Sequence, residues 1–72
     1  MNRVPVRSTN IAEVGYDPAA RRLEIRFRGG RTYEYLNVPT DVFEGLLNAS
    51  SKGAYFHRRI RGRYPTRRVR AG

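Results

Sequence analysis

Hydrophobic and polar residues alternate most regularly between residues 22 and 28, where charged side chains flank each apolar one. The apolar positions of this segment are Leu23, Ile25 and Phe27. A two-residue period is typical of a strand with one buried face. Gly29 and Gly30 follow, and glycine supplies the positive φ that a tight reversal requires. Residues 32–36 then return, so the pattern predicts an antiparallel β-hairpin.

The length of the hairpin loop decides on which face of the sheet Tyr33 and Tyr35 lie. A two-residue loop places Ile25 opposite Glu34, which brings a carboxylate into the core and turns both tyrosines outward. A three-residue loop over 29–31 places Ile25 opposite Tyr35 and keeps one face apolar. We favour this loop, with Tyr33 and Tyr35 mainly in the core. The other register leaves them exposed as a base-stacking pair.

The segments on either side of the hairpin predict a further strand and a helix. A strand is expected at about 8–16, with an irregularity at Gly15, because glycine inside a strand often marks a bulge. Pro39 ends the return strand, and Thr40 or Asp41 is the expected N-cap of a helix. The apolar stripe of this helix is Val42, Phe43, Leu46 and Leu47. We expect the stripe to pack on the apolar face of the hairpin.

A second short helix is predicted after the first. Ser50 or Ser51 can cap a helix that starts near Gly53. Phe56 and Ile60 are four residues apart and share its apolar face. The arginines that then point outward are Arg58, Arg61 and Arg63. The predicted fold class is α+β, with a three-stranded antiparallel meander and two short helices packed on one face.

Length and composition indicate one small domain. The 72 residues suffice for one core, which we expect at about 7–64, followed by a basic tail at 65–72. The chain has no cysteine, no apolar stretch near the roughly 20 residues of a membrane span, and no signal-peptide pattern. We therefore expect a cytoplasmic protein without a membrane partner. Unpaired sheet edges allow a monomer or a weak dimer.

Positive charge is concentrated at the C-terminal end of the chain. The formal net charge is +9, and residues 52–72 hold eight bases and no acid, whereas residues 1–51 hold seven arginines and six carboxylates. Arginine presents a planar set of donors that suits phosphate. The candidate phosphate contacts are Lys52, Arg58, Arg59, Arg61, Arg63, Arg67, Arg68 and Arg70. The run indicates a surface for a polyanion; a solvated face or a dock for an acidic protein are the alternatives.

Two tyrosines, Tyr55 and Tyr64, lie inside the basic run. A partly exposed ring there can stack a nucleobase, and we include Tyr64 in the candidate nucleic-acid site. The alternative is that both rings only cover the sheet edge or the first helix.

The sequence carries no pattern of catalytic residues. It has a single histidine, no cysteine, no Ser-His-Asp order and no metal-ligand spacing. His57 stands beside Arg58 and Arg59, and we interpret it as a surface residue. We expect neither an enzyme nor a metal or other cofactor.

Several short motifs, in their order and spacing, resemble the KTSC domain family. The matching pieces are "VGYD" at 14–17, the L-x-I-x-F strand, Tyr33-x-Tyr35, "VP" at 38–39, "ASSKGAYF" at 49–56, Ile60-Arg61 and Tyr64, within residues 5–69. The family is named for its place at the C-terminus of some lysyl-tRNA synthetases and also occurs as small free-standing bacterial proteins. That context implies RNA binding. The family usually has asparagine where this chain has His57, so no role is carried over to that position.

Charge pattern and resemblance together favour a small non-enzymatic module that binds nucleic acid, RNA rather than DNA. Its phosphate contacts are expected from the arginine-rich C-terminal helix and tail. The alternative is a regulatory adaptor that docks an acidic protein partner through the same basic face.

Overall fold

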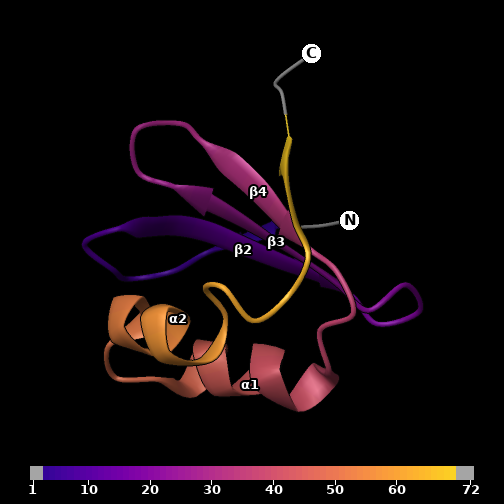
Figure 1. The fold of residues 1–72 in the computed structure, drawn as a ribbon. Coiled ribbons are helices and arrows are strands. Elements are labelled where there is room, and N and C mark those ends of the chain that lie inside the picture. Colours follow the sequence, from indigo (N-terminus) through magenta and orange to yellow (C-terminus); the bar gives the residue numbers. More distant parts are fainter. Residues whose placement is uncertain (1–2, 70–72) are drawn as a thin grey trace.

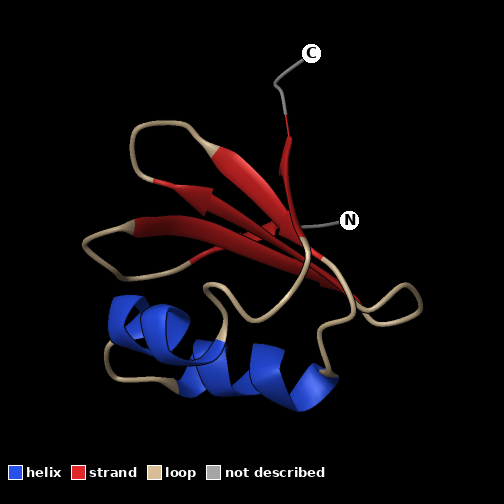
Figure 2. Cartoon of the chain, in the orientation of Figure 1, coloured by secondary structure: helices blue, strands red, loops and turns tan. Residues whose placement is uncertain are grey.

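The computed structural model describes residues 3–69 and consists of one β-sheet with two helices on one of its faces (Figure 1, Figure 2). The elements are β1 (Arg3–Pro5), β2 (Ile11–Asp17), β3 (Arg22–Phe27), β4 (Thr32–Tyr35), α1 (Thr40–Asn48), α2 (Lys52–Arg59) and β5 (Thr66–Val69). The strands are antiparallel and lie in the order β1-β2-β3-β4-β5. The predicted α+β class and the two helices are confirmed. The prediction of three strands is wrong, because the sheet has five.

The two additional strands form the two edges of the sheet. β1 pairs only with β2, and β5 pairs only with β4 among the described strands. Both lie outside the expected core of residues 7–64, and β5 forms from the segment that was expected to be a basic tail. They have only three and four residues, so neither is long enough to show the alternation that identifies a half-buried strand.

The β3–β4 hairpin has a three-residue loop, but it covers residues 28–30 rather than 29–31. Both of its glycines adopt the positive φ that was expected, 103° and 98°. Ile25 consequently pairs with Tyr33 and not with Tyr35. Because the loop still has an odd number of residues, both tyrosines lie on the core side of the sheet.

The irregularity in β2 lies between Ile11 and Glu13, so the expectation of a bulge at Gly15 is wrong. Gly15 pairs in regular register with Arg3 of β1 and Glu24 of β3. A bulge inserts one unpaired residue and turns the alternation of side chains over. The shift near the start of β2 places Ile11 on the same core face as Val14 and Tyr16.

The core lies between the sheet and the helices. Its buried hydrophobic residues are Ile11, Val14, Leu23, Ile25, Tyr35, Val38, Leu46, Phe56 and Ile60. The apolar stripe of α1 and the pair Phe56 and Ile60 pack on the hairpin face, as predicted. At the opposite end from the hairpin loop, the ring of Tyr16 stacks on Phe43 with centroids 4.8 Å apart.

Of the two helices, only α2 has an N-cap whose side chain hydrogen-bonds to the first turn. Ser51 is the N-cap of α2, and its hydroxyl accepts a hydrogen bond from the amide of Ala54 at 3.3 Å. α1 follows Pro39 directly and has no side-chain cap, so Thr40 and Asp41 lie inside the helix rather than before it. Proline suits this position because its fixed φ is compatible with a helix start.

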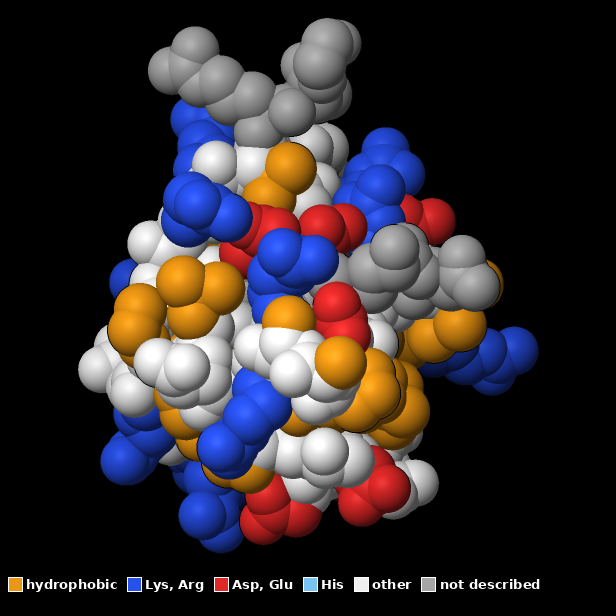
Figure 3. Space-filling model, turned by 90° about the vertical axis from the view of Figure 1, so that its right-hand side faces the viewer, with side chains coloured by type: hydrophobic (Ala, Val, Ile, Leu, Met, Phe, Trp, Pro, Cys, Tyr) orange, Lys and Arg blue, Asp and Glu red, His pale blue; other side chains and the backbone are white. Residues whose placement is uncertain are grey.

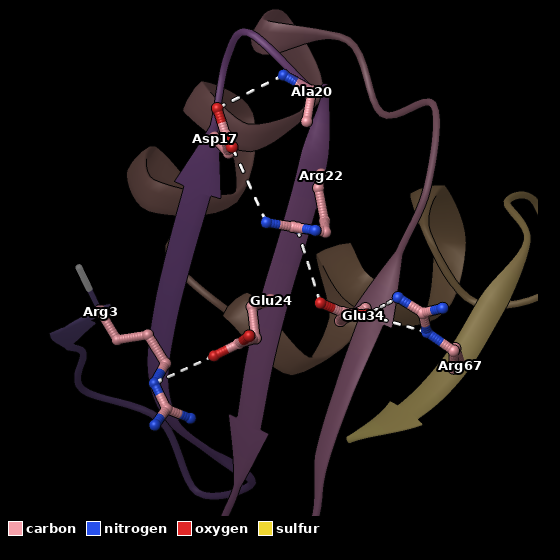
Figure 4. A network of polar contacts seen from close by, with 7 residues as sticks. All are labelled: Arg3, Asp17, Ala20, Arg22, Glu24, Glu34 and Arg67. Atoms are coloured by element: carbon pink, nitrogen blue, oxygen red, sulfur yellow. Dashed lines mark hydrogen bonds and ion pairs between the residues drawn. The ribbon is translucent and has the colours of Figure 1, made fainter. Parts of the chain in front are cut away.

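Charged residues form a row across the outer face of the sheet, which the helices do not cover (Figure 4). The register aligns one residue from each strand: Arg3, Gly15, Glu24, Glu34 and Arg67. Glu24 and Glu34 therefore face each other at the centre of the sheet. Arg3 reaches Glu24 at 3.2 Å across Gly15, which has no side chain to intervene. Arg67 donates from Nη2 and Nε to Oε1 of Glu34 at 2.7 and 3.0 Å.

Further ion pairs neutralise the rest of this face. Arg22 lies 3.5 Å from Glu34 and 3.8 Å from Asp17, and Arg26 lies 3.6 Å from Glu13. Four arginines and four carboxylates thus share the outer face, and their formal charges cancel. Figure 3 shows acidic side chains lying directly beside basic ones on one side of the molecule.

Replacing Arg67 with alanine should lower the free energy of unfolding by about 1–2 kcal/mol, because the largely buried Glu34 loses charge-assisted hydrogen bonds. Arg68→Ala is the matched control, since Arg68 is the exposed neighbour on β5 and forms no ion pair with a described carboxylate. Its effect should stay within about 0.5 kcal/mol. Denaturant unfolding measures both variants, and equal losses would contradict the role of the Arg67–Glu34 pair.

At Gly45, α1 lies against the side chain of Tyr55 from α2. A Cβ at this position would overlap the ring of Tyr55, with Cζ only 2.7 Å away, and the Tyr55 hydroxyl donates to the carbonyl of Val42 at 3.1 Å. Gly45→Ala should therefore destabilise the fold by about 1 kcal/mol or more, despite the better helix propensity of alanine. In a Tyr55→Ala background the same substitution should stabilise by up to about 1 kcal/mol. Thermal unfolding of the double-mutant cycle checks this reversal of sign.

Candidate nucleic-acid interface

Four of the predicted phosphate contacts gather where α2 ends and the chain turns toward β5. These residues are Arg58, Arg59, Arg61 and Arg63, and all four are exposed. None of them forms an ion pair with a carboxylate of residues 3–69. The buried side chain of Ile60 sits among them and fixes their direction, because it anchors the end of the helix in the core.

Part of this cluster surrounds a shallow depression of about 690 Å³, which we call the basic hollow. It is lined by Val42, His57, Arg58, Arg59, Arg63 and Tyr64. Nε of Arg63 donates to the carbonyl of Arg58 at 2.8 Å and holds the turn against the helix end. Tyr64 is half-buried and packs against the core while contributing to the hollow. Cations are also favoured at a helix C-terminus by its dipole, so the cluster supports α2 itself.

The remaining predicted contacts lie elsewhere. Lys52 is at the start of α2, where its ammonium donates to the backbone carbonyl of Ala49 at 3.0 Å. Arg67 is held on the outer face of the sheet and is not brought together with the arginines of α2. Arg68 is exposed on β5, opposite Tyr33. Arg70 lies outside the described residues.

A second depression, which we call the aromatic groove, opens between α2, the loop before β2 and the β3–β4 loop. These three segments lie together on the left of Figure 1. The groove has a volume of about 720 Å³. Its aromatic lining consists of Phe27, Tyr33, Tyr35 and Phe56, and its polar lining of Thr9, Asn10, Arg28, Arg31, His57, Arg61 and Thr66. His57 borders both depressions, so the groove and the basic hollow form adjoining parts of one surface.

The aromatic rings of the groove pack edge to face. The centroids of Phe27 lie 5.9 Å from Tyr33 and 5.3 Å from Phe56, and Phe56 lies 5.7 Å from Tyr35. Tyr35 and Phe56 are buried, whereas Phe27 and Tyr33 are half-buried and leave part of each ring open to the groove. The sequence left open whether the two tyrosines are core or exposed. Tyr35 is core, and Tyr33 combines both roles.

The predicted nucleic-acid site did not include the two arginines beside the hairpin glycines, Arg28 and Arg31; the sequence placed Arg28 beside Tyr33 and Tyr35 only for the register that leaves those rings exposed. Both line the aromatic groove together with Arg61, which comes from the other end of the chain. Nε of Arg28 donates to the carbonyl of Ser8 at 2.9 Å, which ties the side chain to the loop before β2. Their position next to a tight turn was visible in the sequence, but their proximity to α2 follows only from the fold.

Comparison with known proteins identifies this architecture. A sequence profile of the KTSC domain matches residues 7–64. The chain belongs to the KTSC domain family. The crystal structure of a KTSC domain protein from Yersinia pestis superposes with a TM-score of 0.92, at 43% identity over 96% of this chain and 97% of that one. The resemblance noted in the sequence is therefore confirmed.

KTSC relatives occur both alone and inside larger enzymes. A protein from Tsukamurella paurometabola is 45% identical over 60 residues, which cover 83% of this chain and 90% of that protein. A lysine–tRNA ligase from a Nostoc species is 47% identical over 49 residues. That match covers 68% of this chain and 9% of the ligase, so the KTSC domain is a small part of that enzyme.

The described part of this KTSC domain contains no helix of the length and apolarity that crossing a membrane requires. Within residues 3–69, no three side chains of His, Cys, Asp or Glu gather as metal ligands would.

Burial raises the pKa of Tyr35 from 10.0 to about 12, and the neighbouring Tyr33 adds to the rise. The guanidinium of Arg61 opposes it by favouring the phenolate. Arg61, on the rim of the aromatic groove, therefore interacts electrostatically with the Tyr35 hydroxyl in the floor of the groove. The raised pKa means that the folded state keeps a proton on Tyr35 at a pH where the unfolded chain releases it.

The KTSC domain should consequently lose stability as the pH rises from 10 to 12, by about 2 kcal/mol from Tyr35 alone. The loss occurs because the unfolded state binds fewer protons than the native state in this range. Tyr35→Phe removes this contribution, so the stability difference between the wild type and the variant should change across the range. Denaturant unfolding at stepped pH measures it, and parallel profiles would count against the assignment.

Proposed function

We propose that this KTSC domain is a non-catalytic module that binds RNA, with phosphate contacts from the arginines at the end of α2. The observation that carries the proposal is the separation of charge on the molecule. The outer face of the sheet balances its arginines with carboxylates, whereas the cluster Arg58, Arg59, Arg61 and Arg63 has no carboxylate partner among residues 3–69. When several guanidinium groups bind phosphates, they release the counterions condensed on the nucleic acid, and this release favours binding.

The exposed arginines also adjoin half-buried aromatic rings, which is the combination that single-stranded nucleic acids engage. The occurrence of the same domain in lysine–tRNA ligases supports RNA over DNA, because the name of those enzymes states a tRNA substrate. We expect the protein to act in the cytoplasm, where RNA of this kind is found.

The proposal predicts a salt-dependent affinity for single-stranded RNA that falls when arginines of the basic hollow are removed. Arg58→Ala combined with Arg59→Ala should weaken binding on the order of tenfold and make the slope of log K against log salt shallower by about 1.4, since each phosphate contact contributes about 0.7. Arg21→Ala is the control, because Arg21 is exposed at the β2–β3 turn at the other end of the sheet. Fluorescence anisotropy at several salt concentrations provides both quantities.

Two outcomes of this titration, and one outcome of a pull-down, would overturn the proposal. If the wild-type protein does not bind RNA even at low salt, the proposal is wrong. Tighter binding to duplex DNA than to single-stranded RNA at equal salt would replace RNA with DNA. Capture of one acidic protein after nuclease treatment, with no retained nucleic acid, would instead indicate an adaptor that uses the same surface.

A further inference from the structure

We infer that the aromatic groove binds an unpaired nucleobase of single-stranded RNA, while the arginines on its rim hold the phosphates next to that base. The inference rests on the proposed RNA-binding function and names the part of the ligand that each surface takes. The basic hollow serves the backbone, and the groove serves one base.

The open ring surface of the groove suits a flat, aromatic ligand. Phe27 and Tyr33 are half-buried, and the edge-to-face contact at 5.9 Å fixes them relative to each other. Phe56 supports Phe27 from below at 5.3 Å, so the open rings rest on a packed core. Rings held in this way can stack a base without losing side-chain freedom on binding. Stacking tolerates any base, because every base has a π-face.

The charge around the groove suits a phosphate. Arg28 and Arg31 lie on one side and Arg61 on the other, and none of the described lining residues is a carboxylate. The hydrogen bond from Nε of Arg28 to a backbone carbonyl orients its guanidinium and leaves its terminal nitrogens available. An aromatic floor with a rim whose charged side chains are all arginines complements a base attached to phosphates better than it complements an uncharged ligand.

Polar side chains at the rim can hydrogen-bond the edge of a base. Nη1 of Arg61 lies 3.3 Å from Nδ1 of His57, and a guanidinium can only donate, so Nδ1 accepts. In the tautomer that accepts this hydrogen bond at Nδ1, the ring proton is on Nε2, which can donate to a base edge. Thr9, Asn10 and Thr66 add hydroxyl and amide groups to the same rim. Base edges in RNA recognition are read by donors and acceptors of this kind.

The walls of the groove leave room for a ribose and its phosphate. Gly29 and Gly62 have positive φ, and the space that a Cβ would occupy is open at both. The chain therefore presents bare backbone at these points, where a ligand can approach closely. The volume of about 720 Å³ lies within the range of small-ligand sites.

The experiment uses a short single-stranded RNA in which one adenine is replaced by a fluorescent analogue that stacking quenches. Wild-type protein should quench the emission on binding. Tyr33→Leu keeps an apolar side chain on β4 but removes the open ring, so it should abolish most of the quenching and weaken binding about tenfold. Tyr16→Leu is the matched control, since Tyr16 is also half-buried but lies at the opposite end of β2. It should retain the quenching.

A second measurement needs no substitution. The groove is lined by three glycines, Gly29, Gly53 and Gly62, whose amides are resolved in most proton–nitrogen correlation spectra. Addition of a ribodinucleotide should shift these three amides. The amide of Gly45, which faces Tyr55 between the helices, should not move.

The two measurements separate the groove from the RNA proposal. RNA that binds wild type with the expected salt slope, but without quenching and without glycine shifts, overturns the groove while leaving the RNA-binding module intact. Equal quenching by wild type and folded Tyr33→Leu overturns it as well. An RNA that does not bind at any salt concentration overturns both, because the groove then has no ligand of the proposed class.

Discussion

The opposition of Glu24 and Glu34 is the constraint on which the outer half of this domain depends. The hydrogen-bonded register of the central hairpin forces the two carboxylates together, and like charges directly opposite in a sheet are destabilising. Arginines compensate from both directions, with Arg3 on β1 and Arg67 on β5, while Arg22 adds a contact within the hairpin. The edge strands are therefore bound by charge as well as by backbone pairing, and they complete a sheet that the hairpin alone would leave with unbalanced acid.

The sequence allowed the hairpin and both helices to be predicted because each has a strong local pattern of apolar residues. The edge strands have no such pattern. Their support comes from partners far away in the chain, such as Glu34 for Arg67, 33 residues earlier. The bulge was misplaced for a related reason: glycine is a common marker of irregularity, but Gly15 serves to let Arg3 reach Glu24.

The candidate site also has a part that could be predicted from the sequence and a part that could not. Arg58 and its neighbours follow one another on a helix and the turn after it, so their common exposure could be derived from helix geometry and the burial of Ile60. The sequence alone could not show that Arg67 belongs to the outer face or that Arg28 and Arg31 join Arg61. Those groupings arise when the β3–β4 loop lies beside the end of α2, which depends on tertiary packing. A run of like charge in the chain is thus a weak guide to a surface in space.

The balanced outer face has a consequence for how the molecule moves in solution. The charges of the outer face cancel, whereas Arg58, Arg59, Arg61 and Arg63 have no carboxylate partner among residues 3–69, so positive charge is in excess where α2 ends. A body with such a dipole rotates in the field of a polyanion before contact. Encounters with the proposed RNA would then occur mainly with the C-terminal end of α2 foremost, and productive association would be faster than for an evenly charged protein of equal net charge. Glu24 and Glu34, although they lie on the outer face of the sheet, would in this way help to orient the domain.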